Sequence, residues 1–162
     1  MSATDHWIHR TDAPLDRATV VFDLDGVIAD ASHRQRHLRD GRRDWDAFFD
    51  DCVHDTVLPA GAALAAAVDE GHTVVILTAR PDRVLHATVD WLAANEIRHD
   101  VLVLRPRGDR RSSADFKRDE LATLVAQGAQ IVAVVEDSPP NLAMLRDEGY
   151  PAVPVASGYY ES

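Results

Sequence analysis

Short apolar runs, separated by longer mixed segments, set the pattern of this chain. Five runs are rich in β-branched residues and stop abruptly, as buried strands do, at residues 18–23, 73–78, 101–104, 131–135 and 152–155. Segments with helical spacing lie between them, the longest at 59–71, 81–95, 114–127 and 139–148. Strands that alternate with helices predict a mostly parallel sheet with helices on both faces. We therefore expect a single α/β, Rossmann-like domain with right-handed crossovers.

Two segments fall outside this alternation. Residues 1–17 show no periodicity, so we expect a loose N-terminal arm with Trp7 and Ile8 docking on the body. Residues 29–58 separate the first strand from the next long helix and contain two short helices, the first capped by Ser32. We expect this stretch to form a small helical cap, inserted at about 29–58 into a domain of residues 18–162.

The second short helix of the insert carries three aromatic residues on one face, Trp45, Phe48 and Phe49. Two interpretations remain open for them. They pack the insert onto the body, or they offer a stacking surface to a base.

The first strand ends in two aspartates one residue apart, followed at once by a glycine. Because residues i and i+2 of an extended chain point the same way, Asp23 and Asp25 project together from the carboxyl end of the strand. Adjacent carboxylates repel unless a cation neutralises them or one of them holds a proton. The pair therefore predicts a site for a hard cation such as Mg²⁺, or a nucleophile beside a general acid/base.

Polar side chains also end the other strands. Thr78 and Arg80 follow the second strand, Arg105 the third, and Glu136 and Asp137 the fourth. Because ligands bind outside the carboxyl ends of parallel strands, we expect these groups to meet at one edge of the sheet. Lys117, the only lysine, begins the helix after the third strand and supplies a compact positive charge that suits a carboxylate–phosphate pair.

The amino-acid composition and the distribution of charge limit the classes of molecule that the protein is expected to bind. Hydrophobic residues make up 46% and charged residues 27%, as in ordinary soluble proteins. The net charge of −10 argues against a protein that coats long nucleic acid, because such proteins carry broad basic surfaces. The basic residues are nevertheless clustered, which allows a local field that attracts anions. Two short segments hold most of them: Arg34, Arg36, Arg39, Arg42 and Arg43, and Arg105, Arg107, Arg110 and Arg111.

The chain shows no signal peptide and no apolar run long enough to span a bilayer, so we expect no membrane association. Cys52 is the only cysteine, which excludes an internal disulfide and favours a reducing cytoplasm.

Four motifs in this order resemble those of the haloacid dehalogenase superfamily of phosphotransferases. They are Asp23-Leu-Asp-Gly-Val, the strand that ends in Thr78, Lys117, and Glu136-Asp137. Within this superfamily, the chain is most similar to the 3′-phosphatase domain of polynucleotide kinase-phosphatases and their phage-type relatives. The matching pieces are Ser32-His33-Arg34, Asp44-Trp-Asp-Ala-Phe-Phe, Thr78-Ala-Arg80, Arg105-Pro-Arg-Gly108-Asp109 and Val155-Ala-Ser-Gly158-Tyr-Tyr.

The resemblance implies a role for each matching residue. Asp23 is the nucleophile that takes the phosphoryl group as an aspartyl-phosphate. Asp25 protonates the leaving oxygen and then activates water. Thr78 hydrogen-bonds the phosphoryl oxygens, and Lys117 neutralises Asp23 and the phosphate.

The resemblance also implies a metal and a substrate site. Asp23, Asp137 and the main-chain carbonyl of Asp25 would hold Mg²⁺. The residues that match substrate-binding positions are Arg34, Arg80 and Arg105. The sequence departs from its nearest relatives at Glu136, where they carry aspartate, and at Ser112-Ser113-Ala114, where they carry an Asp-Asp pair; Asp115 is the nearest substitute.

The expected function is Mg²⁺-dependent hydrolysis of a phosphomonoester, on a nucleotide or a nucleic-acid 3′ end. Two alternatives stay open. One is a phosphatase for sugar phosphates or similar metabolites, which an acidic chain with a small cap would serve equally well. The other is a non-catalytic module that binds phosphate or a partner.

Overall fold

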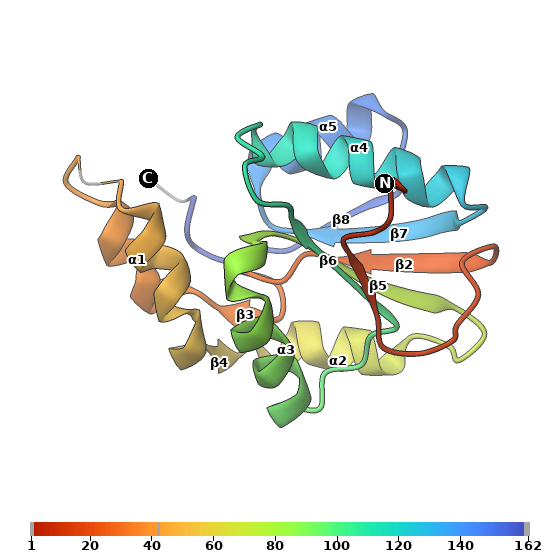
Figure 1. The fold of residues 1–162 in the computed structure, drawn as a ribbon, viewed down its shortest axis with the longest axis horizontal. Coiled ribbons are helices and arrows are strands. Elements are labelled where there is room, and N and C mark those ends of the chain that lie inside the picture. The colour runs from red at the N-terminus through yellow and green to blue at the C-terminus, as the bar shows by residue number, and fades with distance from the viewer. Residues whose placement is uncertain (1, 42, 161–162) are drawn as a thin grey trace.

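The computed structural model describes residues 2–41 and 43–160 and shows a central sheet between two layers of helices (Figure 1). The strand order is β1-β6-β5-β2-β7-β8. The strands are β1 (Trp7–His9), β6 (Val101–Arg105), β5 (Thr73–Pro81), β2 (Ala18–Phe22), β7 (Gln130–Glu136) and β8 (Ala152–Pro154). Only β1 pairs antiparallel with its neighbour in this sheet. The expected α/β class is confirmed.

Helices cover both faces of the sheet because its strands are apolar on both sides. Val20 and Phe22 of β2 face one core, against α2 (Pro59–Ala67) and α3 (Leu85–Ala94), while Val21 faces the other. The second core contains side chains of α4 (Ser113–Ala126) and α5 (Pro139–Asp147). The alternation of side chains along an extended strand thus distributes one apolar run between two cores.

The insert lies beyond the carboxyl ends of the parallel strands (Figure 1). It consists of a two-stranded ribbon and three short helices. The ribbon pairs β3 (Ala29–Asp30) with β4 (Thr56–Val57), and the helices between them are η1 (Ser32–Leu38), α1 (Trp45–Asp50) and η2 (Asp51–His54).

The helix expected from Ser32 differs from the prediction. It is a 3₁₀ helix in which Ser32 is the first residue and Ala31 stands at the N-cap, so no side chain caps it. The Ser32 amide donates to the Asp30 carboxylate at 2.9 Å. The helix ends at Leu38, before Asp40, whose φ is 59°. Asp44 caps the next helix as its side chain accepts from the Ala47 amide at 3.0 Å. Arg42 lies outside the described residues.

The prediction that Pro81 begins a helix is wrong. Pro81 is the last residue of β5 and pairs with Arg105 of β6. A 3₁₀ turn, η3 (Asp82–Val84), follows, and α3 begins at Leu85. Proline fits an extended backbone as well as a first helical turn, so its fixed φ could not distinguish the two.

Near the N-terminus, Trp7–His9 adds an edge strand that the sequence did not predict. Trp7 is buried in the core of α4 and α5, and Ile8 packs against the opposite core. The Trp7 indole donates to the buried Glu120 carboxylate of α4 at 2.7 Å. Both apolar residues therefore dock on the body, as expected, and they do so as part of the sheet.

Candidate active site

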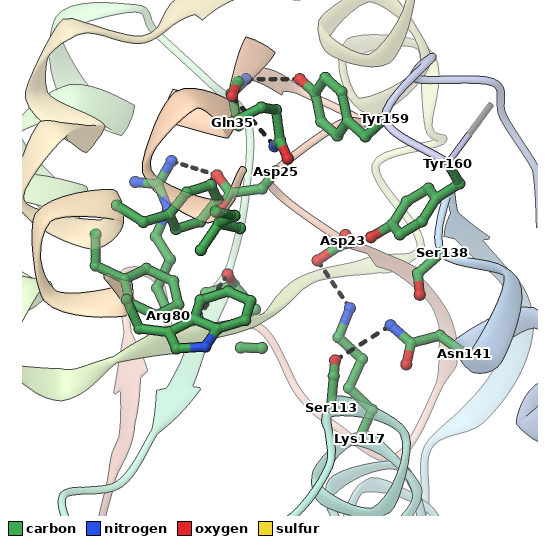
Figure 2. A pocket seen from close by; sticks show the side chains of 17 residues that line it. Asp23, Asp25, Gln35, Arg80, Ser113, Lys117, Ser138, Asn141, Tyr159 and Tyr160 are labelled. Carbon is green, nitrogen blue, oxygen red and sulfur yellow. Dashed lines mark hydrogen bonds and ion pairs between the residues drawn. The ribbon is translucent and has the colours of Figure 1, made fainter. Parts of the chain in front are cut away.

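A pocket of about 230 Å³ opens at the carboxyl ends of the parallel strands (Figure 2). Four residues expected to carry catalysis line it together. They are Asp23, Asp25, Thr78 and Lys117. Arg80 also lines the pocket, while Arg34, Arg105 and Asp137 are not part of its wall. The strand ends therefore meet at one edge of the sheet, as the parallel arrangement requires.

The buried ammonium of Lys117 lies between two carboxylates. Its Nζ is 2.8 Å from Asp23 Oδ1 and 2.7 Å from Glu136 Oε2. Burial alone would lower the pKa of Lys117, but the two carboxylates raise it above its ordinary value. Lys117 is therefore a fixed positive charge beside Asp23.

Three carboxylates cluster around this single ammonium. Oxygens of Asp23, Glu136 and Asp137 lie within 4.8 Å of one another, and all three residues are buried. Burial and the charge of Glu136 raise the pKa of Asp23, although Lys117 acts in the opposite direction. Burial likewise raises the pKa of Asp137 to about 6. A buried excess of negative charge is unfavourable unless a cation neutralises it, so these carboxylates form a candidate cation site.

The hydrogen bonds show which of the three carboxylates are available to a metal. Glu136 is fully used, since Oε1 accepts from the amides of Asp137 and Ser138 at 3.0 Å and Oε2 accepts from Lys117 and Asn141. Asp137 Oδ2, in contrast, is buried and has no hydrogen-bond partner among the described residues. Asp137 and Asp23 thus offer oxygen ligands of the kind that hard cations prefer, and the donor set fits Mg²⁺.

Gly26 makes room for this arrangement. Its φ is 85°, and a Cβ built there would stand 2.2 Å from Asp137 Oδ2. A side chain at this position would collide with the free carboxylate oxygen. The glycine that follows the two aspartates therefore allows the turn and the close approach of Asp137.

Two buried arginines hold Asp25. Its Oδ1 accepts from Arg34 Nη2 at 2.7 Å, and from Arg80 Nη2 and Nε at 2.6 and 3.0 Å. Burial alone would raise the pKa of Asp25, but the charges of Arg80 and Arg34 outweigh it and keep the pKa below its ordinary value. Oδ2 has no hydrogen-bond partner among the described residues and is the oxygen left for chemistry.

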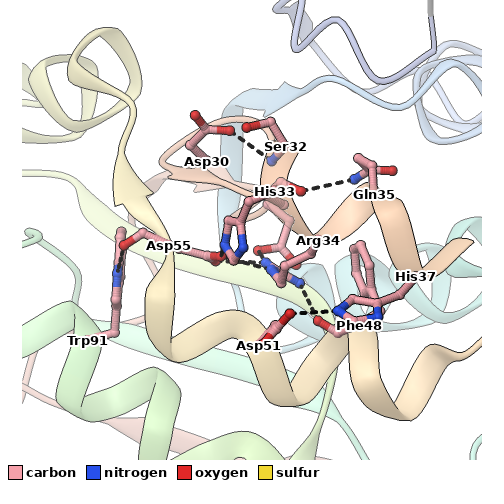
Figure 3. Close-up of polar contacts among 12 residues, drawn as sticks. Asp30, Ser32, His33, Arg34, Gln35, His37, Phe48, Asp51, Asp55 and Trp91 are labelled. Carbon is pink, nitrogen blue, oxygen red and sulfur yellow. Dashed lines mark hydrogen bonds and ion pairs between the residues drawn. The ribbon is translucent and has the colours of Figure 1, made fainter.

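Asp55, at the end of the insert, binds the same two arginines, and Figure 3 shows it beside Arg34. Its Oδ2 accepts from Arg34 Nη2 and Arg80 Nη2 at 2.7 Å, and its Oδ1 accepts from Arg34 Nε at 2.8 Å. His33 Nε2 lies 2.9 Å from the same Oδ1. Two guanidinium groups and two carboxylates therefore form one buried network that joins the insert to β5 and to Asp25.

Arg34 and Arg80 were expected to bind the substrate phosphate, and the structure shows which protein groups they bind. Both side chains are fully buried, and most of their N–H groups donate to carboxylates. The exceptions are Arg34 Nη1, which donates to the Phe48 carbonyl, and Arg80 Nη1, which donates to the Thr88 hydroxyl. The isolated motif could not reveal this, because the partner Asp55 lies in another part of the chain.

Arg105 faces a different space. Its guanidinium lies over the ring of Phe116, 5.2 Å from the centroid, and donates to the Arg111 carbonyl. At the other departures from the family pattern, Ser113 lines the pocket, whereas the Asp115 carboxylate binds Ser112 and Arg118 and does not line it.

Aromatic side chains form the remaining walls of the pocket. Trp45, Phe48 and Phe49 come from α1, and Tyr159 and Tyr160 from the C-terminal segment. Tyr159 also ties that segment to the insert, because its hydroxyl accepts from the Ala31 amide at 2.6 Å and donates to Asp30 at 3.1 Å. The pocket therefore has one charged side and one flat, apolar side.

The sequence analysis missed two residues of the site, Asp55 and Asn141. Asn141 donates to Glu136 and to Ser113, and so supports the carboxylate that holds Lys117. Its place two residues after Ser138-Pro139 was a weak signal, since an inward-facing amide next to the motif can bind it. Asp55 gave no signal, because nothing along the chain links it to Asp25.

The comparisons with known proteins identify a family and agree with the fold. A model of the polynucleotide kinase PNKP phosphatase domain matches residues 17–160. Two solved structures of a Pnkp1/Rnl/Hen1 complex, one described as an RNA repair complex, each contain a similar chain. Identity is 20% and 21% and the TM-score 0.72 and 0.73; 96% and 94% of this chain align with 47% and 49% of the other. This chain thus spans about half the length of those chains.

A haloacid dehalogenase-like hydrolase from Streptococcus pneumoniae is also similar in fold, with 15% identity, a TM-score of 0.57, and 89% of this chain aligned with 87% of that one. The search of curated proteins found no significant match. Among the described residues, no helix has the length and apolar character needed to cross a bilayer.

Proposed function

Because the chain belongs to the phosphatase-domain family of polynucleotide kinases, within the haloacid dehalogenase superfamily, and is a phosphatase, we propose that it removes phosphate from the 3′ end of a nucleotide or nucleic acid. The observation that carries the proposal is the single pocket that gathers Asp23, Asp25, Thr78 and Lys117 within the matched segment. The aromatic wall beside these groups supports a leaving group with a flat face for stacking, such as the base of a nucleoside.

In the first half of the reaction, an Asp23 oxygen attacks phosphorus while the bond from phosphorus to the leaving oxygen breaks. Asp25 delivers a proton to that oxygen through its free Oδ2. The product is an aspartyl-phosphate on Asp23 and a free hydroxyl on the substrate. The Thr78 hydroxyl and the Lys117 ammonium bind the phosphoryl oxygens, whose charge they stabilise.

In the second half, Asp25 takes a proton from water, and the water oxygen attacks phosphorus. The bond to Asp23 breaks, which releases inorganic phosphate and restores the carboxylate. The lowered pKa of Asp25 keeps its carboxylate ionised, so that it has room for this proton. For the first half, the proton enters with the substrate as a phosphate monoanion, whose second pKa is about 6, and Asp25 relays it to the leaving oxygen.

In this proposal Mg²⁺ would be held by Asp23, Asp137 and the main-chain carbonyl of Asp25. When bound, the ion would supply positive charge that stabilises the phosphoryl oxygens. Arg34 and Arg80 act as positioning residues for Asp25. Arg105 contributes to substrate binding outside the pocket. The insert at 29–58 serves as the cap of a domain over residues 18–162, to which residues 1–17 add an N-terminal arm. The cytoplasmic location remains a prediction.

A phosphate-release screen tests the proposal. We expect Mg²⁺-dependent turnover of 3′-phosphorylated oligonucleotides and nucleotides in preference to sugar phosphates. Asp23→Asn should abolish turnover while circular dichroism and the melting temperature show a folded protein, because an amide is a poor nucleophile. Preferential hydrolysis of sugar phosphates would establish the metabolite phosphatase instead. Activity of Asp23→Asn above about a tenth of wild type would contradict the assigned nucleophile.

A further inference from the structure

A second cavity, of about 840 Å³, adjoins the catalytic pocket and lies between α1 and the loop from β6 to α4. Its lining includes Trp45, Phe49, Ala79 and Ser113, which also line the pocket, so the two spaces are adjacent. We call it the arginine groove. Apart from Arg105 and the aromatic residues shared with the pocket, the proposed function assigns no role to its lining residues.

The groove has a surplus of positive charge in a protein whose net charge is −10. Five arginines line it, against the two carboxylates of Asp46 and Asp109. Arg83 and Arg111 form ion pairs, with Asp46 and Asp50 and with Asp109 and Asp119. Arg43 and Arg110 are exposed and form no hydrogen bond or ion pair with another described residue. Their charge is available to an anion.

Trp45 adds a flat apolar surface at the border between the groove and the pocket. Half of it is exposed, which is unusual for so large an apolar side chain. Its ring is nonetheless well supported, because it stacks on Phe49 with centroids 6.0 Å apart and meets Phe48 edge-on at 5.6 Å. A rigid exposed indole next to free arginines is the combination with which proteins bind single-stranded nucleic acid.

We propose that the arginine groove binds the nucleotides on the 5′ side of the scissile 3′ end as an unpaired strand. The base of the adjoining nucleotide stacks on Trp45, and Arg43 and Arg110 bind the phosphodiesters. The strand is unpaired because the faces of a base within a duplex are already covered by neighbouring base pairs. This inference rests on the proposed function and extends it from a 3′-phosphate to a single-stranded tail of at least two nucleotides.

The kinetic test compares kcat/KM for a 3′-phosphorylated tetranucleotide and a 3′-phosphorylated mononucleotide. Trp45→Ala should reduce the value for the tetranucleotide by about 5- to 100-fold more than that for the mononucleotide, the usual worth of one stacked base. Arg43→Ala and Arg110→Ala should each reduce the salt slope for the tetranucleotide by about 0.7. Arg107→Ala is the matched control, since Arg107 is exposed in the same loop but does not line the groove.

A binding test needs no turnover. Trp7 and Trp91 are buried, so quenching of tryptophan fluorescence by an added strand reports mainly on Trp45. In the Asp23→Asn protein, a tetranucleotide with or without a 3′-phosphate should quench in a saturable, salt-sensitive way. A blunt duplex of the same sequence should bind at least tenfold more weakly, and Trp45→Ala should remove the quenching.

The outcomes separate the two proposals. Equal kcat/KM and equal salt dependence for both substrates, or the same loss in Arg107→Ala as in Arg43→Ala and Arg110→Ala, would overturn the groove and leave the phosphatase intact. Equal binding of the duplex would overturn the requirement for an unpaired strand. Saturable quenching in Asp23→Asn, combined with no phosphate release by the wild-type protein from 3′-phosphorylated strands, would support the groove and overturn the proposed 3′-phosphatase.

Discussion

Both arginines bind Oδ1 of Asp25 and leave Oδ2 free. From this difference we predict that Asp25 acts as the general acid and base. Asp25→Asn should slow hydrolysis of a nucleoside 3′-phosphate by on the order of 10²–10⁴, the usual worth of general acid–base catalysis. The loss should be smaller for an aryl phosphate, whose leaving oxygen hardly needs a proton. Initial rates on the two substrates provide the check. Equal losses would mean that Asp25 serves another purpose, such as metal binding.

Asp55 should act on the same step although it does not line the catalytic pocket. Asp55→Asn leaves Arg34 and Arg80 with uncompensated positive charge, so Asp25 shifts from its position. We expect a loss of roughly tenfold or more for a nucleoside 3′-phosphate, which corresponds to about 1.4 kcal/mol or more in the barrier, and a smaller loss for an aryl phosphate.

Asp51→Asn is the matched control for Asp55. Asp51 also belongs to the insert and binds two basic side chains, Arg36 and His37, but it shares neither of these partners with Asp25. It should leave the ratio of the two rates unchanged. A uniform loss on both substrates in Asp55→Asn, together with a lower melting temperature, would reduce Asp55 to a purely structural role.

At the scale of elements, β1 shows how a three-residue strand contributes to the whole sheet. Trp7→Ala should lower the free energy of unfolding by about 3–5 kcal/mol, because it opens a cavity beside α4 and leaves the buried Glu120 without its indole donor. Urea denaturation measures this loss. Trp45→Ala, which removes an indole that is half exposed, should change stability by only about 0.5 kcal/mol. Similar losses in the two variants would contradict the structural role of β1.

The short elements of the insert depend on polar contacts more than on helix length. None of η1, α1 and η2 is long enough to be stable alone. The Arg34–Asp55 pair and the Tyr159 hydroxyl tie the insert to itself and to the C-terminal segment. The position of the insert therefore depends on the same ion pairs that hold Asp25.

At the scale of the whole molecule, the metal site joins chain segments more than a hundred residues apart. Because Asp23 and Asp137 follow different strands, Mg²⁺ at the proposed site should bind only the folded chain and should therefore raise the melting temperature. At a Mg²⁺ concentration of about 100 times the Kd, binding should stabilise the folded chain by roughly 2.7 kcal/mol. Asp137→Asn should abolish the shift and, in EDTA, melt no lower than wild type, since it removes one of three clustered carboxylates. A shift of equal size in both proteins would place the metal elsewhere.

The sequence by itself determined the sheet class and the edge that carries the chemistry. Both follow from local rules, since apolar runs form buried strands and parallel strands end together. Asp23, Asp25 and Thr78 could thus be placed around one space from the sequence, and the resemblance to a known family added Lys117. Local rules failed at Pro81, which suits a strand end and a helix start alike, and at Trp7–His9, where the strand is too short to show a period.

Only the tertiary structure decided what each charged side chain binds. Arg34, Arg80 and Asp55 come from three separate elements, and their network forms because a buried guanidinium must find carboxylates wherever the fold brings them. The same holds for Glu136, whose four hydrogen bonds exclude it from the metal site, and for Arg105, which faces the groove. Charge pairing acts through space and leaves no periodic pattern along a chain, so the sequence could name these residues but not their partners.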